Sequence, residues 1–462
     1  MTDLPIGRAF AVLAERSPDA VAVHDGADVW TRRRLEDDTN RLARSWQDQV
    51  GLDDVVTVAL PSGIDLVRAC VAAWKLGATP QPLAPTLDVA ERQAVLDLTG
   101  PALVVDGPLG EVDGDPRPLP DAVASSWKAP TSSGSTGRPK VVRAAAPATV
   151  DLDRPVAPFV PRHAVQLVAS PLFHAAPFVY AMRGLMTGHE LVLMPTFDPA
   201  EWLRLVEHHR VTWSVLVPAT MHRVHRLGPD ALAAADVSSL EQVLHLGARC
   251  PAWLKRAWID WLGPERVVEV YAGTESQGVA MITGAEWLAH PGSVGRGCGG
   301  TRFRVARADG EDCVPGERGE ILMRRDHPTY SYVGAEPTVR DGWHTLGDVG
   351  YLDADGFLFV EDRLADVVTT GGTVVYPADV EGVLEAHPAV RSCVVVPAAD
   401  DRLGQVVHAV VETDADLADL ERWATERLSP ERRPRSWQRV AEPLRADTGK
   451  VNRGRWRPST GE

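Results

Sequence analysis

The chain has 462 residues, of which 44% are apolar and 24% are charged, a composition typical of folded globular proteins. Its formal net charge of −15 argues against a surface for nucleic acids or anionic membranes, because such surfaces need basic patches. The length predicts two or three domains at about 150 residues each. The sequence shows neither an 18-residue apolar run nor an N-terminal basic segment before an apolar core, so we expect no membrane span, no signal peptide and a cytoplasmic location. The five cysteines lack metal-ligand spacing, and we expect them to be reduced thiols.

Residues 30–105 alternate strand-like and helix-like patterns. Val55–Leu60 is a short apolar run that predicts a strand, and Ile64–Leu76 has apolar residues at helical spacing up to Gly77. Leu103–Val105 is another short strand candidate. This part of the chain therefore predicts successive β and α elements.

A loop rich in serine, threonine and glycine follows, at Thr131–Lys140. Its hydroxyl groups, glycines and terminal lysine suit a polyphosphate, because they offer hydroxyl donors, exposed backbone N–H groups and one cation. The pattern differs from the common P-loop G-x-x-x-x-G-K-[ST], since the lysine follows a proline and no hydroxyl residue follows the lysine. The loop therefore predicts ATP binding by another kind of phosphate loop.

Lysine is rare in this chain, since only five of the 48 basic residues are lysines. The arginine bias fits a GC-rich genome, so we expect a lysine where arginine cannot replace it. Lys140 and Lys450 agree with this interpretation, because both lie in glycine-containing loops. The other three are Lys75, Lys128 and Lys255.

The middle of the chain repeats the alternation of strands and helices. Short apolar strands between helices predict a parallel sheet buried on both faces. Ligands of such sheets bind beyond the carboxyl ends of the strands, where Gly247–Ala248 and Tyr271–Glu275 are expected. The predicted elements are strands at Trp213–Val217, Gln242–Leu246 and Val267–Val270, a helix from Pro218, and a helix from Pro251 to about Leu262.

The composition changes after about residue 290, where glycines cluster and turn dipeptides follow. We expect antiparallel strands there, with turns at Asp309–Gly310, Pro315–Gly316 and Asp355–Gly356. The last part, from residue 367 to 462, predicts a separate small α+β domain. Its expected elements are strands at Val367–Thr370, Cys393–Val396 and Val406–Val411, and helices from Pro377 and from Ala415.

Six segments carry motifs in a fixed order. They are Ser132–Lys140, Pro171–His174, Tyr271–Glu275, Gly342–Asp348, Asp362–Arg363 with Gly371–Gly372, and Thr448–Lys450. In this order they resemble the phosphate loop, the aromatic/His gate, the Tyr-Gly-x-Thr-Glu motif, the ribose-binding segment, the hinge and the C-terminal catalytic loop of the acyl-adenylate-forming superfamily. That superfamily includes acyl-CoA synthetases, adenylation domains of peptide synthetases and luciferases. The resemblance covers the chain from about residue 8 to its end, and around 245–271 it is strongest to acyl-CoA synthetases of actinobacterial type.

The resemblance implies an α/β fold with two unequal domains. Residues 1–362 would form a large ATP- and acid-binding domain of parallel-rich sheets packed with helices, with a distorted β-barrel-like part. Residues 363–366 would be a hinge that pivots at Ala365. Residues 367–462 would form a small, mobile α+β domain that carries the catalytic loop.

The reaction implied by the resemblance has two steps. A carboxylic acid (aryl, alicyclic or fatty) attacks the α-phosphate of ATP in the presence of Mg²⁺, which gives acyl-AMP and pyrophosphate. The thiol of coenzyme A then displaces AMP to form a thioester. The implied partners are therefore a small acid and coenzyme A, with no nucleic acid, and the protein would be a monomer or a homodimer.

The resemblance also assigns roles to single residues. Lys450 would bridge the carboxylate and the α-phosphate, Glu275 would bind Mg²⁺, and His174 would be the gate between the two steps. Tyr271 would stack on adenine, and Asp348 with Arg363 would bind the ribose. The full set of nucleotide-binding candidates is Ser132, Ser133, Gly134, Ser135, Thr136, Gly137, Lys140, Gly247, Ala248, Arg249, Tyr271, Ala272, Gly273, Thr274, Asp348 and Arg363. The candidates for the acyl pocket are Phe178, Val217, Thr220, Met221, Leu246, Gly273 and Gly278.

The chain departs from the family pattern at several positions. Ala365 stands where Asp or Lys is usual, Val374 where Asn is common, and Val141 where Gly is frequent. The stretch Arg143–Ala169 is short for the family. These differences leave ATP binding well supported, but they leave open the second step and an ordinary fatty substrate.

Two alternatives remain open from the sequence. The enzyme could load a separate carrier protein or activate an atypical substrate. The chain could also be a non-catalytic ATP- or AMP-binding protein, although the presence of Lys140, Glu275, Asp348, Arg363 and Lys450 argues against that hypothesis.

Overall fold

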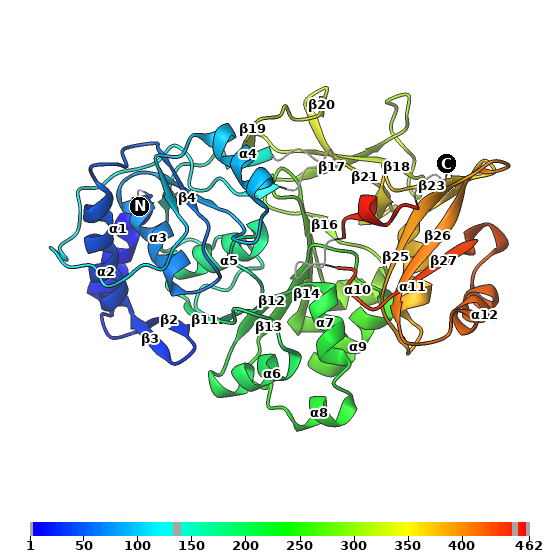
Figure 1. Cartoon of the computed structure of the whole chain (residues 1–462), viewed down its shortest axis with the longest axis horizontal. Coiled ribbons are helices and arrows are strands. Elements are labelled where there is room, and N and C mark those ends of the chain that lie inside the picture. The colour runs from blue at the N-terminus through cyan, green and yellow to red at the C-terminus, as the bar shows by residue number, and fades with distance from the viewer. Residues whose placement is uncertain (1–2, 133–139, 446–450, 459–462) are drawn as a thin grey trace.

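The computed structural model describes residues 3–132, 140–445 and 451–458 (Figure 1). Figure 1 shows a large unit, coloured blue to yellow, beside a smaller unit in orange and red. This arrangement confirms the predicted α/β fold with a large N-terminal and a small C-terminal part. Within the described residues, none of the helices is long and apolar enough to cross a membrane.

The main sheet of the large unit is mixed, and its centre is parallel. The central strands are short apolar runs such as β12 (Trp213–Leu216), because helices cover both faces of the sheet. Its order in the described chain is β16 (Arg296–Gly297), β15 (Val279–Thr283), β14 (Val267–Ala272), β13 (Gln242–Leu246), β12, β10 (Val165–Val168), β11 (Glu190–Leu193), β2 (Val21–Asp25) and β3 (Asp28–Thr31). The connecting helices are α5 (Ala175–Met186), α6 (Pro199–His208), α7 (Pro218–His225), α8 (Pro229–Ala234), α9 (Ala252–Leu262) and α10 (Gly284–Ala289).

A smaller parallel sheet lies in the N-terminal part, in the order β5 (Thr79–Pro82), β4 (Val55–Val58) and β6 (Leu103–Val105). Helix α3 (Ile64–Lys75) packs beside it and is buried along almost its whole length. The ring of Trp74 on α3 stacks with Trp127, which stacks in turn with Phe178 of α5, so this core joins the two sheets. The neighbouring elements are α1 (Ile6–Arg16), α2 (Arg32–Trp46), α4 (Val89–Thr99), β1 (Leu4–Pro5) and β9 (Thr149–Val150).

Antiparallel strands follow the main sheet, as predicted. The turn glycines Gly310, Gly316 and Gly356 all have positive φ, with values of 91°, 83° and 77°. One sheet contains β17 (Arg302–Ala306), β18 (Gly319–Arg324), β21 (Trp343–Leu352), β20 (Val339–Arg340) and β22 (Leu358–Arg363). Another joins β19 (Tyr330–Val333) to β8 (Lys140–Ala144) and β7 (Thr131–Ser132).

The C-terminal unit has its own sheet and its own apolar core, which includes Val380, Val395 and Leu420. Helices α11 (Pro377–Glu385) and α12 (Leu417–Arg427) pack against each other, and α11 packs on β25. The strand order is β24 (Thr373–Val375), β23 (Val368–Thr370), β26 (Gly404–Thr413) and β25 (Val390–Asp400), and β27 (Ser436–Val440) pairs with β26. The C-terminal unit thus has a core of its own, and the division at 1–362, 363–366 and 367–462 stays a prediction.

Several predicted bounds differ from the structure for local reasons. The last helix begins at Leu417 and not at Ala415, because the Asp416 carboxylate caps it by accepting from the Ala418 N–H group at 3.2 Å. Strand β25 is longer than the predicted Cys393–Val396, because it pairs with β26 along its whole length. Strand β14 continues to Ala272 because its last residues pair with β15.

Candidate active site

Two polar segments meet at the carboxyl ends of β13 and β14. These neighbouring strands are parallel, with Leu246 opposite Val270, so the residues that follow them lie at the same edge of the sheet. Gly247 follows β13 in the left-handed region at φ 89°, and Ala272 ends β14 before Gly273–Glu275. The structure therefore brings the predicted segments Gly247–Arg249 and Tyr271–Glu275 together.

Glu275 lies in a cluster with Lys140 and Tyr332. The Lys140 Nζ atom is 3.5 Å from Glu275 Oε1 and 3.0 Å from the hydroxyl oxygen of Tyr332. The Tyr332 hydroxyl donates to the same Glu275 oxygen. Burial and this bond to Glu275 raise the pKa of Tyr332, so the phenol stays a donor. The cluster joins one cation to one buried carboxylate beside the phosphate loop.

Glu275 fits a metal-ligand role on chemical grounds. Its side chain is 7% exposed, and its carboxylate is the kind of hard oxygen ligand that Mg²⁺ prefers. Phosphate oxygens and water would complete the shell of such an ion. Mg²⁺ would neutralise charge on the phosphates when bound.

A second cluster joins Tyr271, Asp348 and Arg363. Asp348 of β21 lies directly opposite Arg363 of β22, and the Arg363 Nε atom is 2.8 Å from Asp348 Oδ1. The Tyr271 hydroxyl donates to the other carboxylate oxygen at 2.5 Å. Burial and the neighbouring Asp348 raise the pKa of Tyr271. Asp348 is buried while Arg363 is half exposed, so the cluster combines a fixed acceptor with an accessible cation.

His174 occupies the position before the first residue of α5, and its ring lies 4.7 Å from the ring of Phe173. Phe178, one turn later, is fully buried between Trp74 and Trp127. It therefore packs the core of the described structure. The gate role of His174 and the acyl-pocket role of Phe178 stay predictions.

The other acyl-pocket candidates lie close to the strand ends but are mostly buried. The Thr220 hydroxyl bonds the backbone of Val217 at the start of α7, which gives it a local structural role. A Cβ at Gly278 would lie 2.5 Å from the Met323 sulfur, and one at Gly273 would lie 2.6 Å from Leu346. Both glycines therefore permit close packing. Val217, Met221 and Leu246 are also buried.

Arg249, predicted beside adenine, contacts the C-terminal unit in this structure. Its Nη1 atom is 3.2 Å from Asp379 Oδ1 on α11, and its side chain is 46% exposed. Ala248 is half-buried between Gly247 and Arg249. A role of this segment at adenine stays a prediction.

Some predicted residues lie outside the described part of the chain. These are Ser133, Gly134, Ser135, Thr136, Gly137 and Lys450. Ser132 and Lys140, which bracket the first group, pair with each other across β7 and β8. The two strands thus hold the ends of the predicted phosphate loop side by side.

Two residues near the site were missed by sequence reasoning. Tyr332 reaches Glu275 because β19 pairs with β8, and no local pattern indicates that pairing. Lys128 is 4% exposed, and its Nζ atom is 3.5 Å from the Thr274 carbonyl oxygen. Burial lowers the pKa of Lys128 to about 8, and nearby Arg183 contributes. The rarity of lysine was the one signal that could have found Lys128.

Comparison with known proteins places these features in context. Residues 10–129 and 128–333 match the sequence model of the AMP-binding enzyme family, and residues 379–450 match that of the AMP-binding enzyme C-terminal domain. The chain is 31% identical to a feruloyl-CoA synthase of Amycolatopsis over 481 residues, covering 96% of each chain. It is 29% identical to a 2-succinylbenzoate–CoA ligase of Bacillus licheniformis, covering 95% of this chain and 97% of the relative.

Solved structures agree in fold. An o-succinylbenzoate CoA synthetase from Bacillus subtilis, solved with its acyl-adenylate intermediate, superposes with a TM-score of 0.81 at 24% identity, covering 99% of both chains. An amide bond synthetase from Marinactinospora thermotolerans has a TM-score of 0.81 at 23% identity, covering 98% of this chain and 99% of that one.

Proposed function

The chain belongs to the AMP-binding enzyme family, and we propose that it is an AMP-forming acid–CoA ligase. It would activate a carboxylic acid with ATP and pass the acyl group to coenzyme A. The observation that carries this proposal is the pair of clusters at one edge of the sheet: Lys140 with Glu275, and Asp348 with Arg363. One offers a cation and a metal ligand to phosphates, and the other offers a carboxylate to a vicinal diol.

In the first step, a carboxylate oxygen of the acid attacks the α-phosphorus of ATP. A new P–O bond forms, the bond to the β-phosphate oxygen breaks, and pyrophosphate leaves with the electron pair. Negative charge gathers at the α-phosphate, where Lys450 would stabilise the transition state. Lys140 would hold the outer phosphates, and Asp348 with Arg363 would orient the ribose.

In the second step, the thiol of coenzyme A gives up its proton to solvent and its sulfur attacks the acyl carbon. A C–S bond forms, the C–O bond to the phosphate of AMP breaks, and AMP leaves as the phosphate anion. We expect no role for Lys450 in this step, because displacement at the α-phosphorus is complete and the attack now takes place at the acyl carbon. We therefore propose that residues 367–462 rotate about 363–366, with Ala365 as pivot, to withdraw Lys450 between the two steps. His174 would then open a path for the thiol.

For the acid we propose an aryl carboxylate. The two relatives reported above match over nearly their full length, and their names specify feruloyl and 2-succinylbenzoate groups, which both carry an aromatic ring. Long-chain fatty-acid ligase of Bacillus subtilis matches over a shorter part, 62% of this chain. An aryl acid therefore fits the relatives better than a fatty acid.

The experiment is a two-stage assay with a panel of acids: ferulic, benzoic, cyclohexanecarboxylic, octanoic and palmitic. Acid-dependent exchange of pyrophosphate into ATP tests the first step, and mass spectrometry with coenzyme A tests for the thioester. We expect the fastest exchange with an aryl acid, followed by its CoA thioester. Pyrophosphate exchange without formation of a CoA thioester would indicate that the acyl group goes to another acceptor, such as a carrier protein. Exchange with none of the acids would refute the activity.

A further inference from the structure

Two arginines of the C-terminal unit flank the segment that carries Lys450. Arg445 immediately precedes residues 446–450, and Arg453 follows Lys450 by three positions. Their side chains are only 19% and 13% exposed, so both guanidinium groups are largely removed from water. Charges this buried need hydrogen-bond acceptors or counter-charges. The acceptors of the two arginines show which elements the arginines connect.

Both arginines meet one carboxylate, that of Glu381 on α11. Arg453 contacts both Glu381 oxygens: its Nη1 atom bonds Oε1, and its Nη2 atom is 3.2 Å from Oε2. The Arg445 Nη2 atom is 3.6 Å from the same Oε2. Glu381 is 6% exposed and accepts a further bond from the Val395 N–H group at 2.7 Å. Burial opposes its ionisation, but Arg453 and Arg445 outweigh burial and lower the pKa of Glu381.

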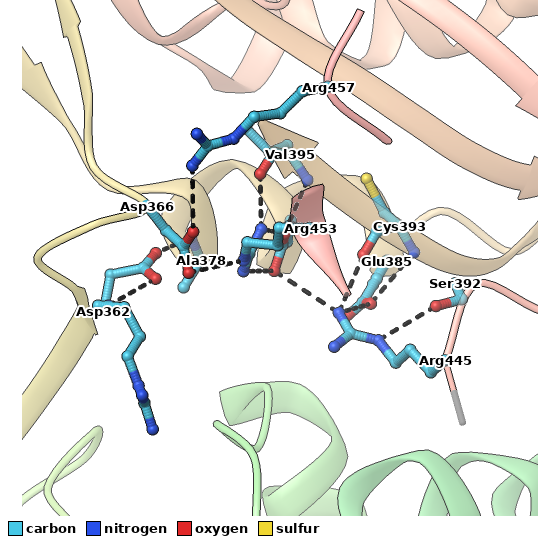
Figure 2. A network of polar contacts seen from close by, with 12 residues as sticks. Asp362, Asp366, Ala378, Glu385, Ser392, Cys393, Val395, Arg445, Arg453 and Arg457 are labelled. Atoms are coloured by element: carbon cyan, nitrogen blue, oxygen red, sulfur yellow. Dashed lines mark hydrogen bonds and ion pairs between the residues drawn. The ribbon is translucent and has the colours of Figure 1, made fainter. Parts of the chain in front are cut away.

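Further contacts fix Arg445 on the edge of β25 (Figure 2). It donates to the Cys393 carbonyl oxygen at 2.9 Å and lies 3.2 Å from both Ser392 Oγ and Glu385 Oε1. Figure 2 shows Arg445 beside Ser392, Cys393 and Glu385, and Arg453 at the centre of the network, next to Val395. Arg445 and Arg453, on either side of residues 446–450, are therefore bound to one helix and one strand.

The same network reaches the predicted hinge. The Arg453 Nε atom is 3.5 Å from Asp366 Oδ2. Arg457 donates to the Ala365 carbonyl oxygen at 3.2 Å and lies 3.7 Å from Asp366 Oδ1 (Figure 2). Residues that follow Lys450 thus contact the residues about which the unit would turn.

We propose that Arg445, Glu381 and Arg453 form a clamp that holds the residues on either side of 446–450 in place for adenylation, and that Arg453 and Arg457 couple this clamp to the predicted hinge at Ala365–Asp366. The clamp residues are positioning residues, since they act through Lys450 and not on the substrate. This inference rests on the proposed function, because it assigns Lys450 to the first step only.

The test is Glu381→Gln, which keeps the shape of the side chain but removes the charge that both arginines share. We expect pyrophosphate exchange to fall about 10- to 100-fold, because small displacements of a catalytic group have effects of this size. The acid is the panel member that gives the fastest exchange with the unchanged protein. Thioester formation from its chemically prepared acyl-adenylate and coenzyme A should change by less than about threefold, because that step does not use Lys450.

Glu36→Gln is the matched control. Glu36 is also a buried carboxylate bonded to a cation, Lys75, but it lies between α2 and α3 in the large unit. The Glu36→Gln substitution should lower the melting temperature without changing the ratio between the rates of the two reaction steps. Equal losses in both steps for Glu381→Gln would show a merely structural role, and an unchanged exchange rate in a folded variant would refute the clamp.

A second measurement needs no substrate. Hydrogen–deuterium exchange of peptides spanning 440–458 should be faster in Glu381→Gln and in Arg445→Lys than in the unchanged protein, and unchanged in Glu36→Gln. Equal protection in all four proteins would overturn the clamp even if the enzymatic activity is confirmed. Absence of any acid-dependent exchange in the unchanged protein would refute the proposed function, while the hydrogen–deuterium exchange would still decide whether the Glu381 clamp protects this part of the chain.

Discussion

Lys75 and Lys128 are both almost fully buried, but their surroundings differ. Lys75 lies between α2 and α3, and its Nζ atom is 2.6 Å from Glu36 Oε2. Lys128 lies beside the candidate active site, where the described residues offer its ammonium group a carbonyl oxygen at 3.5 Å and the more distant charge of Glu275. Lys75 is therefore a buried charge that is paired inside the fold. Lys128 is a buried cation whose positive charge is only partly balanced by its neighbours.

The same contrast separates the candidate active site from the clamp. In the large unit, Lys140 and Arg363 each contact one carboxylate and keep side-chain exposures of 26% and 53%. In the small unit, Arg445 and Arg453 are largely buried and contact several acceptors each. Fully partnered charges hold the fold in place, whereas partly partnered charges at the strand ends are available to an anionic ligand.

The two buried lysines give the largest expected difference in stability. Lys75→Met should destabilise the protein by about 3–5 kcal/mol, because it leaves Glu36 buried without its counter-charge. Lys128→Met should stabilise it by roughly 1–3 kcal/mol at pH 7, because it removes a cation whose pKa is lowered to about 8. Chemical denaturation of both variants measures the two changes, and a loss of stability in both would contradict the contrast.

The stability gained by Lys128→Met should depend on pH. The pKa of Lys128 in the folded protein, about 8, lies below its usual 10.5, so the unfolded chain binds more protons between these values. The cost of burying the charge is fully present below pH 8 and is lost as the pH rises toward 10.5. The stabilisation by Lys128→Met should therefore be smaller at pH 9.5 than at pH 7, and an equal effect at both would refute the lowered pKa of Lys128.

Among the variants, Lys450→Ala is expected to cause the largest difference between the losses of rate in the two reaction steps. Pyrophosphate exchange should fall about 10²- to 10³-fold, which is typical when one group that stabilises transition-state charge is removed. Thioester formation from a supplied acyl-adenylate should be largely retained. Rapid-quench measurements of both steps test this, and equal losses would contradict the rotation of the C-terminal unit.

Glu275→Gln should act through the metal. We expect about a 10²-fold loss of adenylation at low Mg²⁺, partly recovered at high Mg²⁺, because the amide is a weaker ligand than the carboxylate. A Mg²⁺ titration of pyrophosphate exchange measures the shift. Tyr332→Phe is the control, since it removes only the hydrogen bond to Glu275 and should change the Mg²⁺ requirement much less.

Asp348→Asn should have the smallest of these effects and should appear in nucleotide binding. Loss of a charge-assisted acceptor corresponds to roughly a 10-fold increase in the KM for ATP, with little change in kcat. The variant also removes the counter-charge of Arg363, so circular dichroism should confirm that it folds. A normal KM for ATP would remove Asp348 from the nucleotide site.

Local sequence signals located much of this fold. The strands Gln242–Leu246 and Leu103–Val105 have the predicted bounds, because each short run ends directly before a turn-forming residue, Gly247 or Asp106. The turns at Gly310, Gly316 and Gly356 were readable because glycine permits positive φ. The ordered motifs were sufficient to predict the family.

The contacts that complete the site required the tertiary structure. Tyr332 reaches Glu275 across 57 residues, and Lys128 reaches Thr274 across 146, through strand pairings that no local pattern encodes. Arg445 and Arg453 share Glu381 only because α11 packs on β25 and so presents this carboxylate beside both. The sequence therefore determined which chemical groups are present and in which order, while packing between distant segments decided which charges are paired and which remain available to a ligand.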